Sequence, residues 1–277
     1  MKNVISLDIG GTNFRVAKID SSLNMIESSS SSTIKNNLDL FCMQLIDMIS
    51  KIIDENSVAI SLGVPGRVNS VTGYIYALPN IGISNFDLVQ ILFEKFRLPV
   101  YIKNDAEMAV LAESVIGAGK EYDSTYFITI STGLGGALSV HKNNAISSGE
   151  IGHTLVKYGS SCYEFEEIAS GTGIVKLARL NKLIISSSKE LFEAVARGET
   201  KAKKVFKDWL AIMKQFFDLI GETFSPGIIV ITGGVMKSKE FFFSELQRQS
   251  SVPVCECKTG ENAGLFGAAI YAFKQIN

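Results

Sequence analysis

Small and polar residues follow a short apolar run near the start of the chain. The stretch Ile5–Ile19 ends its first apolar run at Asp8, continues through Gly10 and Gly11, and then begins a second apolar pattern. This order predicts a strand, a tight turn and a return strand. Two adjacent glycines remove Cβ bulk where a backbone takes positive φ or lies close to a ligand, so the turn suits a phosphate. An ordinary hairpin turn is the alternative interpretation.

Polar side chains on both sides of the glycines extend that chemistry. Thr12 and Asn13 add small hydrogen-bonding groups. Asp8 repels a phosphate, because both are negatively charged, but its carboxylate could hold a hydrated magnesium ion that binds the phosphate. The turn therefore predicts a site for a phosphate and magnesium.

A second carboxylate follows another predicted strand. Val100–Ile102 is a short apolar run that delivers Asn104 and Asp105 directly before a helix expected from Ala106. Such strand ends are where open α/β sheets bind ligands. The Asp105 carboxylate could take a proton from a hydroxyl that Asn104 orients, a role usually worth roughly 10²–10⁴ in rate. A helix N-cap is the alternative for this pair, but its occurrence beside phosphate turns favours a general base.

The opening pattern occurs again in the second half of the chain. Tyr126–Ile130 is a predicted strand, Ser131–Gly136 a glycine-rich turn and Ala137–Val140 a return strand. Thr232–Gly234 follows a later strand and offers a third glycine surface, where a base or ribose could lie. The repeat predicts two similar α/β domains that face one another across a cleft. We expect domains at 1–117 and 118–262, with a terminal helix (263–277) packing back on the first.

Other segments are predicted from periodicity and turn residues. Helical spacing of apolar residues predicts helices at 38–52 and 202–224, the first after a serine-rich loop at Ser28–Ser32. Ser84 is a predicted cap of a helix that Pro99 ends. Gly117 and Gly119 are predicted hinges between the domains. Phe241–Phe243 could belong to an apolar contact or to the core, and we favour the core.

Composition excludes several classes of protein. The chain has 277 residues, 46% of them hydrophobic, and 27 basic against 28 acidic side chains give a formal charge of -1. No basic run marks a nucleic-acid site, and an anionic membrane surface is equally disfavoured. We expect a cytoplasmic protein, because no signal peptide or membrane-spanning run is visible. The four cysteines lack the spacing of a disulfide framework.

The motifs together resemble the ROK sugar kinases of the actin and hexokinase superfamily. The resemblance runs almost end to end and is specific in combination, although each motif alone is weak. The matching segments are LDIGGTN (Leu7–Asn13), VPGRVN (Val64–Asn69), LPN (Leu78–Asn80), KNDAEMAVLAE (Lys103–Glu113), STGLGGA (Ser131–Ala137), GEIGH (Gly149–His153), FEEIASG (Phe165–Gly171) and ITGGV (Ile231–Val235).

The resemblance implies two ribonuclease H-like domains and ATP-dependent phosphorylation of a hexose, typically at the 6-hydroxyl. It implies that Asp105 is the catalytic base and that Asp8 serves magnesium. The implied sugar contacts, with Asp105, are Gly66, Asn80, Asn104, Glu150, His153 and Glu166. The implied ATP contacts are Asp8, Gly10, Gly11, Thr12, Asn13, Thr132, Gly133, Gly233 and Gly234. Glu164 and Glu167 lie close enough to Glu166 to be alternatives in register.

One departure from the family concerns zinc. Most members carry closely spaced cysteines after the GEIGH histidine, and these bind a structural zinc together with that histidine. Here the interval from His153 to Phe165 contains only Cys162, while Cys255 and Cys257 belong to a different element. One thiol and one imidazole do not complete a tetrahedral site, so we predict no zinc. A sugar contact is the preferred role for His153, and a structural histidine is the alternative.

The short, zinc-lacking form resembles N-acetylmannosamine kinases, so this sugar is the predicted substrate. Glucose, fructose and allose are the alternatives, since one hydroxyl or acetamido difference depends on pocket shape. The family also includes sugar-responsive repressors that carry a helix-turn-helix domain ahead of the first glycine turn. Asp8 comes too early for such a domain, and the charge is near neutral, so this function is disfavoured. A homodimer is expected from the resemblance.

Overall fold

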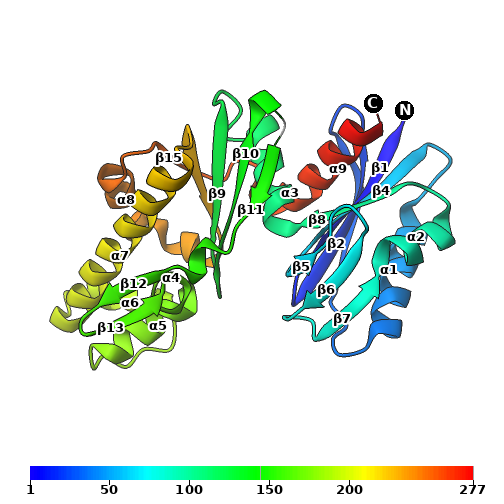
Figure 1. Cartoon of the computed structure of the whole chain (residues 1–277). Coiled ribbons are helices and arrows are strands. Elements are labelled where there is room, and N and C mark those ends of the chain that lie inside the picture. Colours follow the sequence, from blue (N-terminus) through cyan, green and yellow to red (C-terminus); the bar gives the residue numbers. More distant parts are fainter. Residues whose placement is uncertain (144, 277) are drawn as a thin grey trace. The chain divides into compact units, whose positions relative to one another are not determined.

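The computed structural model describes residues 1–143 and 145–276, and the chain forms two compact units (Figure 1). Unit 1 combines Met1–Val115 with the segment that starts at Thr259, and unit 2 is Ile116–Lys258. The last residue of the predicted 263–277 helix, Asn277, lies outside the described residues.

Unit 1 is built on a five-stranded sheet of order β3-β2-β1-β4-β8. The first three strands pair antiparallel, whereas β1, β4 and β8 run parallel, so their carboxyl ends lie at the same edge. The strands are β1 (Asn3–Ile9), β2 (Asn13–Asp20), β3 (Met25–Ser32), β4 (Ser57–Val64) and β8 (Val100–Asn104). A small sheet contains β5 (Arg67–Val68), β6 (Tyr74–Leu78) and β7 (Ile83–Asp87). The helices are α1 (Leu38–Ile52), α2 (Leu88–Phe96), α3 (Asp105–Val115), η4 (Gly260–Asn262) and α9 (Ala263–Ile276).

Helix α1 forms as its apolar spacing predicts. Asn37 caps it by accepting a hydrogen bond from the Leu40 N–H, and its buried face includes Phe41, Leu45 and Ile49. Because this spacing places the apolar side chains on one stripe, the helix buries them in the core that β1 and β4 also fill.

Helix α9 packs closely on α3, and it also contacts β1 and β4. A Cβ atom at Gly267 would lie 1.7 Å from the carbonyl oxygen of Met108. Glycine is therefore required at this crossing, since any side chain would separate the two backbones.

Unit 2 repeats the architecture of unit 1. Its sheet has the order β11-β10-β9-β14-β15, again with an antiparallel hairpin followed by parallel strands. These strands are β9 (Ser124–Ile130), β10 (Leu134–Val140), β11 (Ala145–Ser148), β14 (Ile228–Thr232) and β15 (Val254–Glu256). A separate hairpin contains β12 (Leu155–Tyr158) and β13 (Ser161–Glu164). The helices are η1 (His141–Asn143), η2 (Ile151–His153), α4 (Phe165–Ala169), α5 (Gly171–Leu180), α6 (Ser188–Ala196), α7 (Thr200–Phe224), η3 (Gly234–Phe241) and α8 (Phe243–Gln249).

Aromatic side chains fill the core of unit 2. Trp209 is fully buried and packs edge-on against Phe242, which also stacks on Phe192. Phe241 and Phe243 are partly buried against the same core. The aromatic run at 241–243 is therefore part of the core, as we predicted.

Two local predictions were wrong. Ser84 does not cap a helix, because Ile83–Asp87 forms strand β7 and Asp87 caps α2 by accepting from the Gln90 N–H. Ser28–Ser32 is not a loop, because it belongs to β3, which pairs with β2 at the edge of the described sheet. Both segments place polar side chains in solvent while their backbones hydrogen-bond in a sheet, and side-chain polarity alone does not reveal that pairing.

Within the part of the chain that the structure describes, no helix combines the length and apolar character needed to cross a membrane. The four cysteines are free, Cys42 being buried and Cys162 exposed.

Candidate active site

The carboxyl edge of the unit 1 sheet brings together residues from three strands. Register pairs Asp8 on β1 with Gly63 on β4, and Gly63 with Lys103 on β8, so the three form one row across the sheet. Asn104 and Asp105 follow directly after that row. The two aspartates that the sequence singles out thus belong to one edge of one sheet.

The turn between β1 and β2 is held by backbone and side-chain hydrogen bonds. The Gly10 N–H donates to the Asn13 carbonyl at 3.0 Å, and the Thr33 hydroxyl donates to the Gly10 carbonyl at 2.8 Å. A Cβ at Gly10 would lie 2.8 Å from the Asn13 carbonyl oxygen. Thr12 and Asn13 are exposed at this turn.

The second glycine of the turn packs against the loop that carries Asn80. A Cβ at Gly11 would lie 2.6 Å from the Asn80 Cβ. Asn80 itself is exposed. The predicted phosphate turn and one of the predicted sugar residues are therefore neighbours within unit 1.

Asp8 forms an ion pair with Arg15, a residue outside the predicted site. The Arg15 guanidinium donates to Asp8 Oδ2 at 2.6 Å, and Arg15 also donates to Asn262 at 3.4 Å. Burial raises the pKa of Asp8, and the charge and hydrogen bond of Arg15 oppose that increase. A Cβ at Gly264 would lie 2.6 Å from Asp8 Oδ1, so the start of α9 approaches the carboxylate closely.

Asn104 and Asp105 both contact the first turn of α3. Asn104 donates through Nδ2 to the Gly66 carbonyl at 3.3 Å, and its Oδ1 accepts from the Ala106 N–H at 2.9 Å. Asp105 Oδ1 accepts from the same N–H at 2.8 Å. The N-cap interpretation therefore describes a contact that both residues make, while Asp105 remains half-buried at the sheet edge. Gly66 has a φ of +91°, which favours glycine.

In unit 2, the turn between β9 and β10 is held in a similar way. The Ser131 N–H donates to the Gly133 carbonyl at 2.9 Å. The Thr172 hydroxyl donates to the Thr132 carbonyl at 2.6 Å, and the Gly171 N–H donates to the Ser131 carbonyl at 2.7 Å. The start of α5 therefore fixes the backbone of this glycine-rich turn.

Glu166 points at that turn. Its Oε2 accepts from the Leu134 N–H at 2.8 Å, and a Cβ at Gly133 would lie 2.5 Å from the same oxygen. A Cβ at Gly152 would lie 2.2 Å from the Leu134 carbonyl oxygen, so the GEIGH segment packs on the turn as well. The three neighbouring glutamates differ in their partners, because Glu167 pairs with Lys176 and Glu164 with His153.

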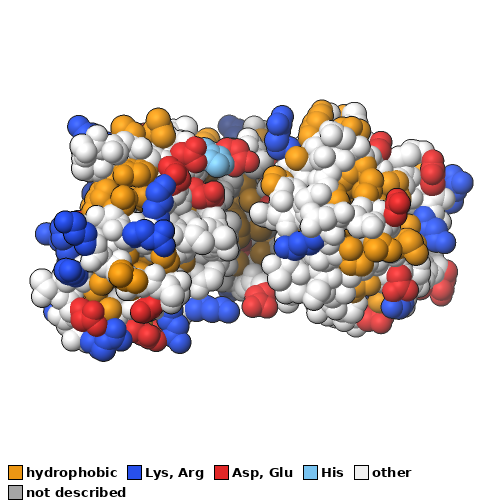
Figure 2. Space-filling view, turned by 90° about the horizontal axis from the view of Figure 1, so that it is seen from below, with side chains coloured by type: hydrophobic (Ala, Val, Ile, Leu, Met, Phe, Trp, Pro, Cys, Tyr) orange, Lys and Arg blue, Asp and Glu red, His pale blue; other side chains and the backbone are white. Residues whose placement is uncertain are grey.

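His153 lies between two carboxylates. Its Nδ1 is 2.7 Å from Glu164 Oε2, and its Nε2 is 3.6 Å from Glu150 Oε2. The hydrogen bond to Glu164 is the main cause of a raised pKa for His153, and the charges of Glu164, Glu166 and Glu150 add to it. The space-filling view shows a histidine bordered by acidic side chains (Figure 2).

The glycines after β14 lie next to the end of β9. Gly233 has a φ of +107°, and a Cβ there would lie 2.3 Å from the Ile130 carbonyl oxygen. A Cβ at Gly234 would meet no atom within 4 Å, so its backbone faces open space. The contact of a base or ribose with these glycines stays a prediction.

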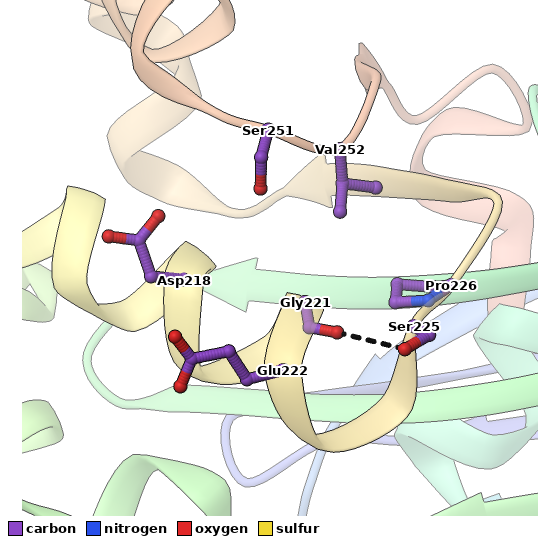
Figure 3. Close-up of a pocket in the computed structure, with 7 residues that line it drawn as sticks. All are labelled: Asp218, Gly221, Glu222, Ser225, Pro226, Ser251 and Val252. Atoms are coloured by element: carbon purple, nitrogen blue, oxygen red, sulfur yellow. Dashed lines mark hydrogen bonds between the residues drawn. The ribbon is translucent and has the colours of Figure 1, made fainter.

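A pocket lies at the start of β14, at the opposite end of this strand from Gly233 and Gly234 (Figure 3). Its volume is about 400 Å³, and none of the predicted site residues lines it. The lining residues are Asp218, Gly221, Glu222, Ser225, Pro226, Ser251 and Val252. Because β14 runs from Ile228 to Thr232, the pocket borders the start of the strand while the glycines follow its end.

The residues do not fit the zinc site that is usual in the resembled family. Among residues 1–143 and 145–276, no group of three or more His, Cys, Asp or Glu side chains has the arrangement of a metal site. The Nδ1 atom of His153 already contacts a carboxylate, and Cys162 is exposed.

The chain was compared with known families, proteins and structures. The chain matches the ROK family over residues 4–275. It is 28% identical to a glucokinase of Halalkalibacterium halodurans, with 88% of this chain and 84% of that protein covered. It is 27% identical to an N-acetylmannosamine kinase of Yersinia pestis, with 97% of each chain covered.

Solved structures agree with these relatives. A ROK hexokinase from Thermus thermophilus is 26% identical and has a TM-score of 0.84, with 99% of each chain covered. A ROK family glucokinase from Streptomyces griseus in complex with glucose and AMPPNP is 23% identical, with a TM-score of 0.77 over 98% of this chain and 99% of that chain. The predicted α/β fold of the hexokinase type is therefore confirmed.

Proposed function

The chain belongs to the ROK family, and on that premise we propose that it is a sugar kinase that transfers the γ-phosphoryl group of ATP to the 6-hydroxyl of a hexose. One observation carries the proposal. The parallel strands β1, β4 and β8 bring Asp8 and Asp105 to the same edge of one sheet, beside a glycine turn that contacts the Asn80 loop. A metal-binding acid, a base and a phosphate turn are the groups that phosphoryl transfer to an alcohol requires.

The close packing of both glycine turns supports their proposed role in holding the nucleotide. Gly10, Gly11 and Gly133 stand where a Cβ would collide with neighbouring atoms, so their backbones are packed in fixed positions. We propose that these turns hold the phosphates together with Thr12, Asn13 and Thr132, and that Gly233 and Gly234 face the nucleoside. Asp8 would hold Mg²⁺ through water, and the bound ion would neutralise charge that develops on the phosphates.

Asp105 is proposed as the general base. Phosphoryl transfer passes through a loose transition state, so the protein mainly has to align the sugar oxygen and accept its proton. Asp105 is half-buried at the first turn of α3, and the preceding residue, Asn104, donates a hydrogen bond to the Gly66 carbonyl. This arrangement supports a carboxylate of fixed position beside a loop that contacts the sugar.

The remaining polar side chains are proposed sugar ligands. Sugar hydroxyls both donate and accept, so carboxylates, amides and an imidazole can satisfy them in a defined geometry. Within unit 1 these ligands are the side chains of Asn80 and Asn104, and the backbone of Gly66 is a further proposed sugar contact. Within unit 2 they are Glu150, His153 and Glu166, of which Glu166 also contacts the glycine turn.

We propose N-acetylmannosamine as the sugar, with glucose, fructose and allose as the alternatives. Measuring ADP release with each of these sugars, and with mannose and N-acetylglucosamine, ranks them by kcat/KM. A ranking led by glucose would replace the proposed substrate and leave the proposed reaction intact. The predicted homodimer is tested separately by light scattering after size-exclusion chromatography.

The Asp105→Asn variant tests the proposed reaction. We expect kcat to fall by roughly 10²–10⁴ or more, since the amide cannot take the proton, while sugar binding measured by calorimetry persists. Asp39→Asn, at an exposed position on α1, is the matched control and should keep full turnover. A fully active Asp105→Asn variant would refute the base assignment. A wild-type chain that binds sugar without turnover would favour a sugar-binding regulator instead.

A further inference from the structure

The position of Glu164 beside His153 is fixed from two directions. Strand β13 ends at Glu164, which pairs across the hairpin with Leu155, two residues after His153. The Phe165 N–H also donates to the Thr154 carbonyl at 3.0 Å. Glu164 then caps α4, because its N–H donates to the Glu167 carboxylate at 3.0 Å.

The histidine is equally constrained. The backbone N–H of His153 donates to the Glu150 carbonyl at 3.0 Å in the short helix η2, and Gly152 packs on Leu134. In the His153 side chain, Nδ1 lies 2.7 Å from Glu164 Oε2, and Nε2 faces the Glu150 carboxylate. Two backbone segments therefore hold one carboxylate–imidazole pair.

This pair is incompatible with zinc at the same nitrogen. A metal binds the lone pair of an imidazole nitrogen, whereas a carboxylate acceptor requires a proton on that nitrogen. The Nδ1 atom of His153 can satisfy only one of these partners. Cys162, the nearby thiol, is a single exposed residue on the same hairpin.

We propose that Glu164 orients His153 for the sugar by a hydrogen bond, in place of the zinc that the family resemblance implies for this histidine. The proposal rests on the proposed sugar-kinase function and makes Glu164 a positioning residue. A carboxylate on Nδ1 fixes the ring orientation, as it does for metal-binding histidines elsewhere in proteins. The Nε2 atom then accepts from a sugar hydroxyl when the ring is neutral and donates to one when the ring is protonated.

The histidine can be observed directly, because the chain has only two, His141 and His153. Nitrogen-15 NMR of the full chain, with the His153→Gln variant to assign the signals, reports the tautomer and pKa of His153. In the wild type we expect a proton on Nδ1 and a raised pKa. In Glu164→Gln we expect the pKa to fall, since Glu164 is the largest contributor among the three facing carboxylates, the others being Glu150 and Glu166.

Kinetics separates positioning from folding. We expect Glu164→Ala to raise the KM for the sugar about tenfold, within the range seen when an orienting carboxylate is lost, with a smaller change in kcat and in the KM for ATP. Glu164→Gln keeps a hydrogen-bonding group at the cap and should recover part of the loss. Glu121→Gln, at an exposed loop position, is the control and should match the wild type.

Metal content provides a test that does not depend on activity. Elemental analysis of the purified chain should find far less than one zinc per chain, and a zinc chelator should leave the sugar KM unchanged. Stoichiometric zinc that disappears in His153→Gln would overturn the proposal, as would an unchanged His153 pKa and tautomer in Glu164→Gln. A wild-type chain with no sugar kinase activity but with the expected NMR result would refute the proposed function and leave the pairing intact.

Discussion

Asp8 and Arg15 illustrate how a local hairpin sets the electrostatics of a candidate site. Asp8 and Arg15 are direct partners in the β1–β2 register, and their side chains meet at 2.6 Å. Burial disfavours the charged carboxylate, so its pKa is raised even though Arg15 opposes the effect. A carboxylate must be ionised to hold magnesium, so Arg15 would extend the pH range over which Asp8 could take its proposed magnesium role.

Replacing Arg15 tests this relation. In Arg15→Met the lowering influence on Asp8 is lost, so its pKa should rise further and the carboxylate should become protonated at a higher pH. We expect the acid limb of kcat/KM for MgATP to move to higher pH, and the KM for MgATP to rise about tenfold at acid pH, as losing a charged hydrogen bond implies. Arg15→Lys keeps the positive charge and should shift the limb less. If the acid limb of kcat/KM lies at the same pH in the wild type and both variants, Arg15 does not control the ionisation of Asp8.

The sequence contained a signal for Arg15 but none for the contact of Glu164 with His153. A two-strand prediction with a turn at Gly10 and Gly11 places residue 8 opposite residue 15, so the hairpin register alone could have identified the pair. Glu164 lies eleven residues after His153, and the contact depends on the β12–β13 hairpin between them. No local pattern at Glu164 distinguishes it from Glu166 and Glu167.

At the scale of elements, the crossing of α3 and α9 depends on one position without a side chain. Gly267 on α9 faces the backbone of Met108 on α3, and both helices also contact β4. Cores close-packed at this level cannot absorb an added methyl group without moving a backbone. The small residues of α9 therefore allow α9 and α3 to pack closely against each other over one sheet.

Gly267→Ala tests that approach. Its Cβ would lie 1.7 Å from a carbonyl oxygen, so one helix must shift, and we expect a loss of stability of about 1–3 kcal/mol or more. Thermal unfolding followed by circular dichroism measures the change. Gly149→Ala is the matched control, because a Cβ there meets no atom within 4 Å and its melting temperature should stay close to that of the wild type. Equal melting temperatures for both variants would show that the crossing is loose.

Most elements could be predicted, but the pairing of strands outside the two glycine hairpins could not. The helix at 38–52 and the two glycine hairpins follow from apolar periodicity and turn residues, which are local. The predicted cap at Ser84 places the start of a helix within Ile83–Asp87, yet this segment is strand β7, which hydrogen-bonds to β6. The serines of β3 form a strand because they pair with the edge of β2. This pairing depends on the tertiary fold, and the serines themselves do not indicate it.

At the scale of the molecule, the two units share one strand order but differ in how the chain completes them. Unit 2 is a single segment, whereas unit 1 needs the chain to return at Thr259 and add α9. The return is anchored by the buried Glu113 carboxyl group, which accepts from the Thr259 N–H at 2.7 Å and from its hydroxyl at 2.5 Å. Glycine at 119 has a packing reason, since a Cβ there would lie 2.0 Å from the Thr125 hydroxyl oxygen. Its predicted role as a hinge stays a prediction.

This difference in continuity predicts that the units fold with different requirements. The segment 116–258 contains all five strands of its sheet and the core around Trp209, so we expect it to fold alone. The segment 1–115 lacks α9, and without that helix Ala17 and Ile19 on β2, Val4 on β1 and Ala59 on β4 lose part of their cover. Exposed apolar surface costs about 25 cal/mol per Å², and a domain is stable by only about 5–15 kcal/mol, so we expect the segment 1–115 to be unfolded.

The two segments can be compared by circular dichroism and by the dispersion of their amide NMR spectra. We expect a cooperative thermal transition for 116–258 and none for 1–115, and we expect a peptide of residues 259–277 to restore a transition when added to 1–115. A segment 1–115 that folds cooperatively without the peptide would mean that α9 is dispensable for unit 1. In that case the close contact of Gly267 with Met108 would be a consequence of the fold and not one of its causes.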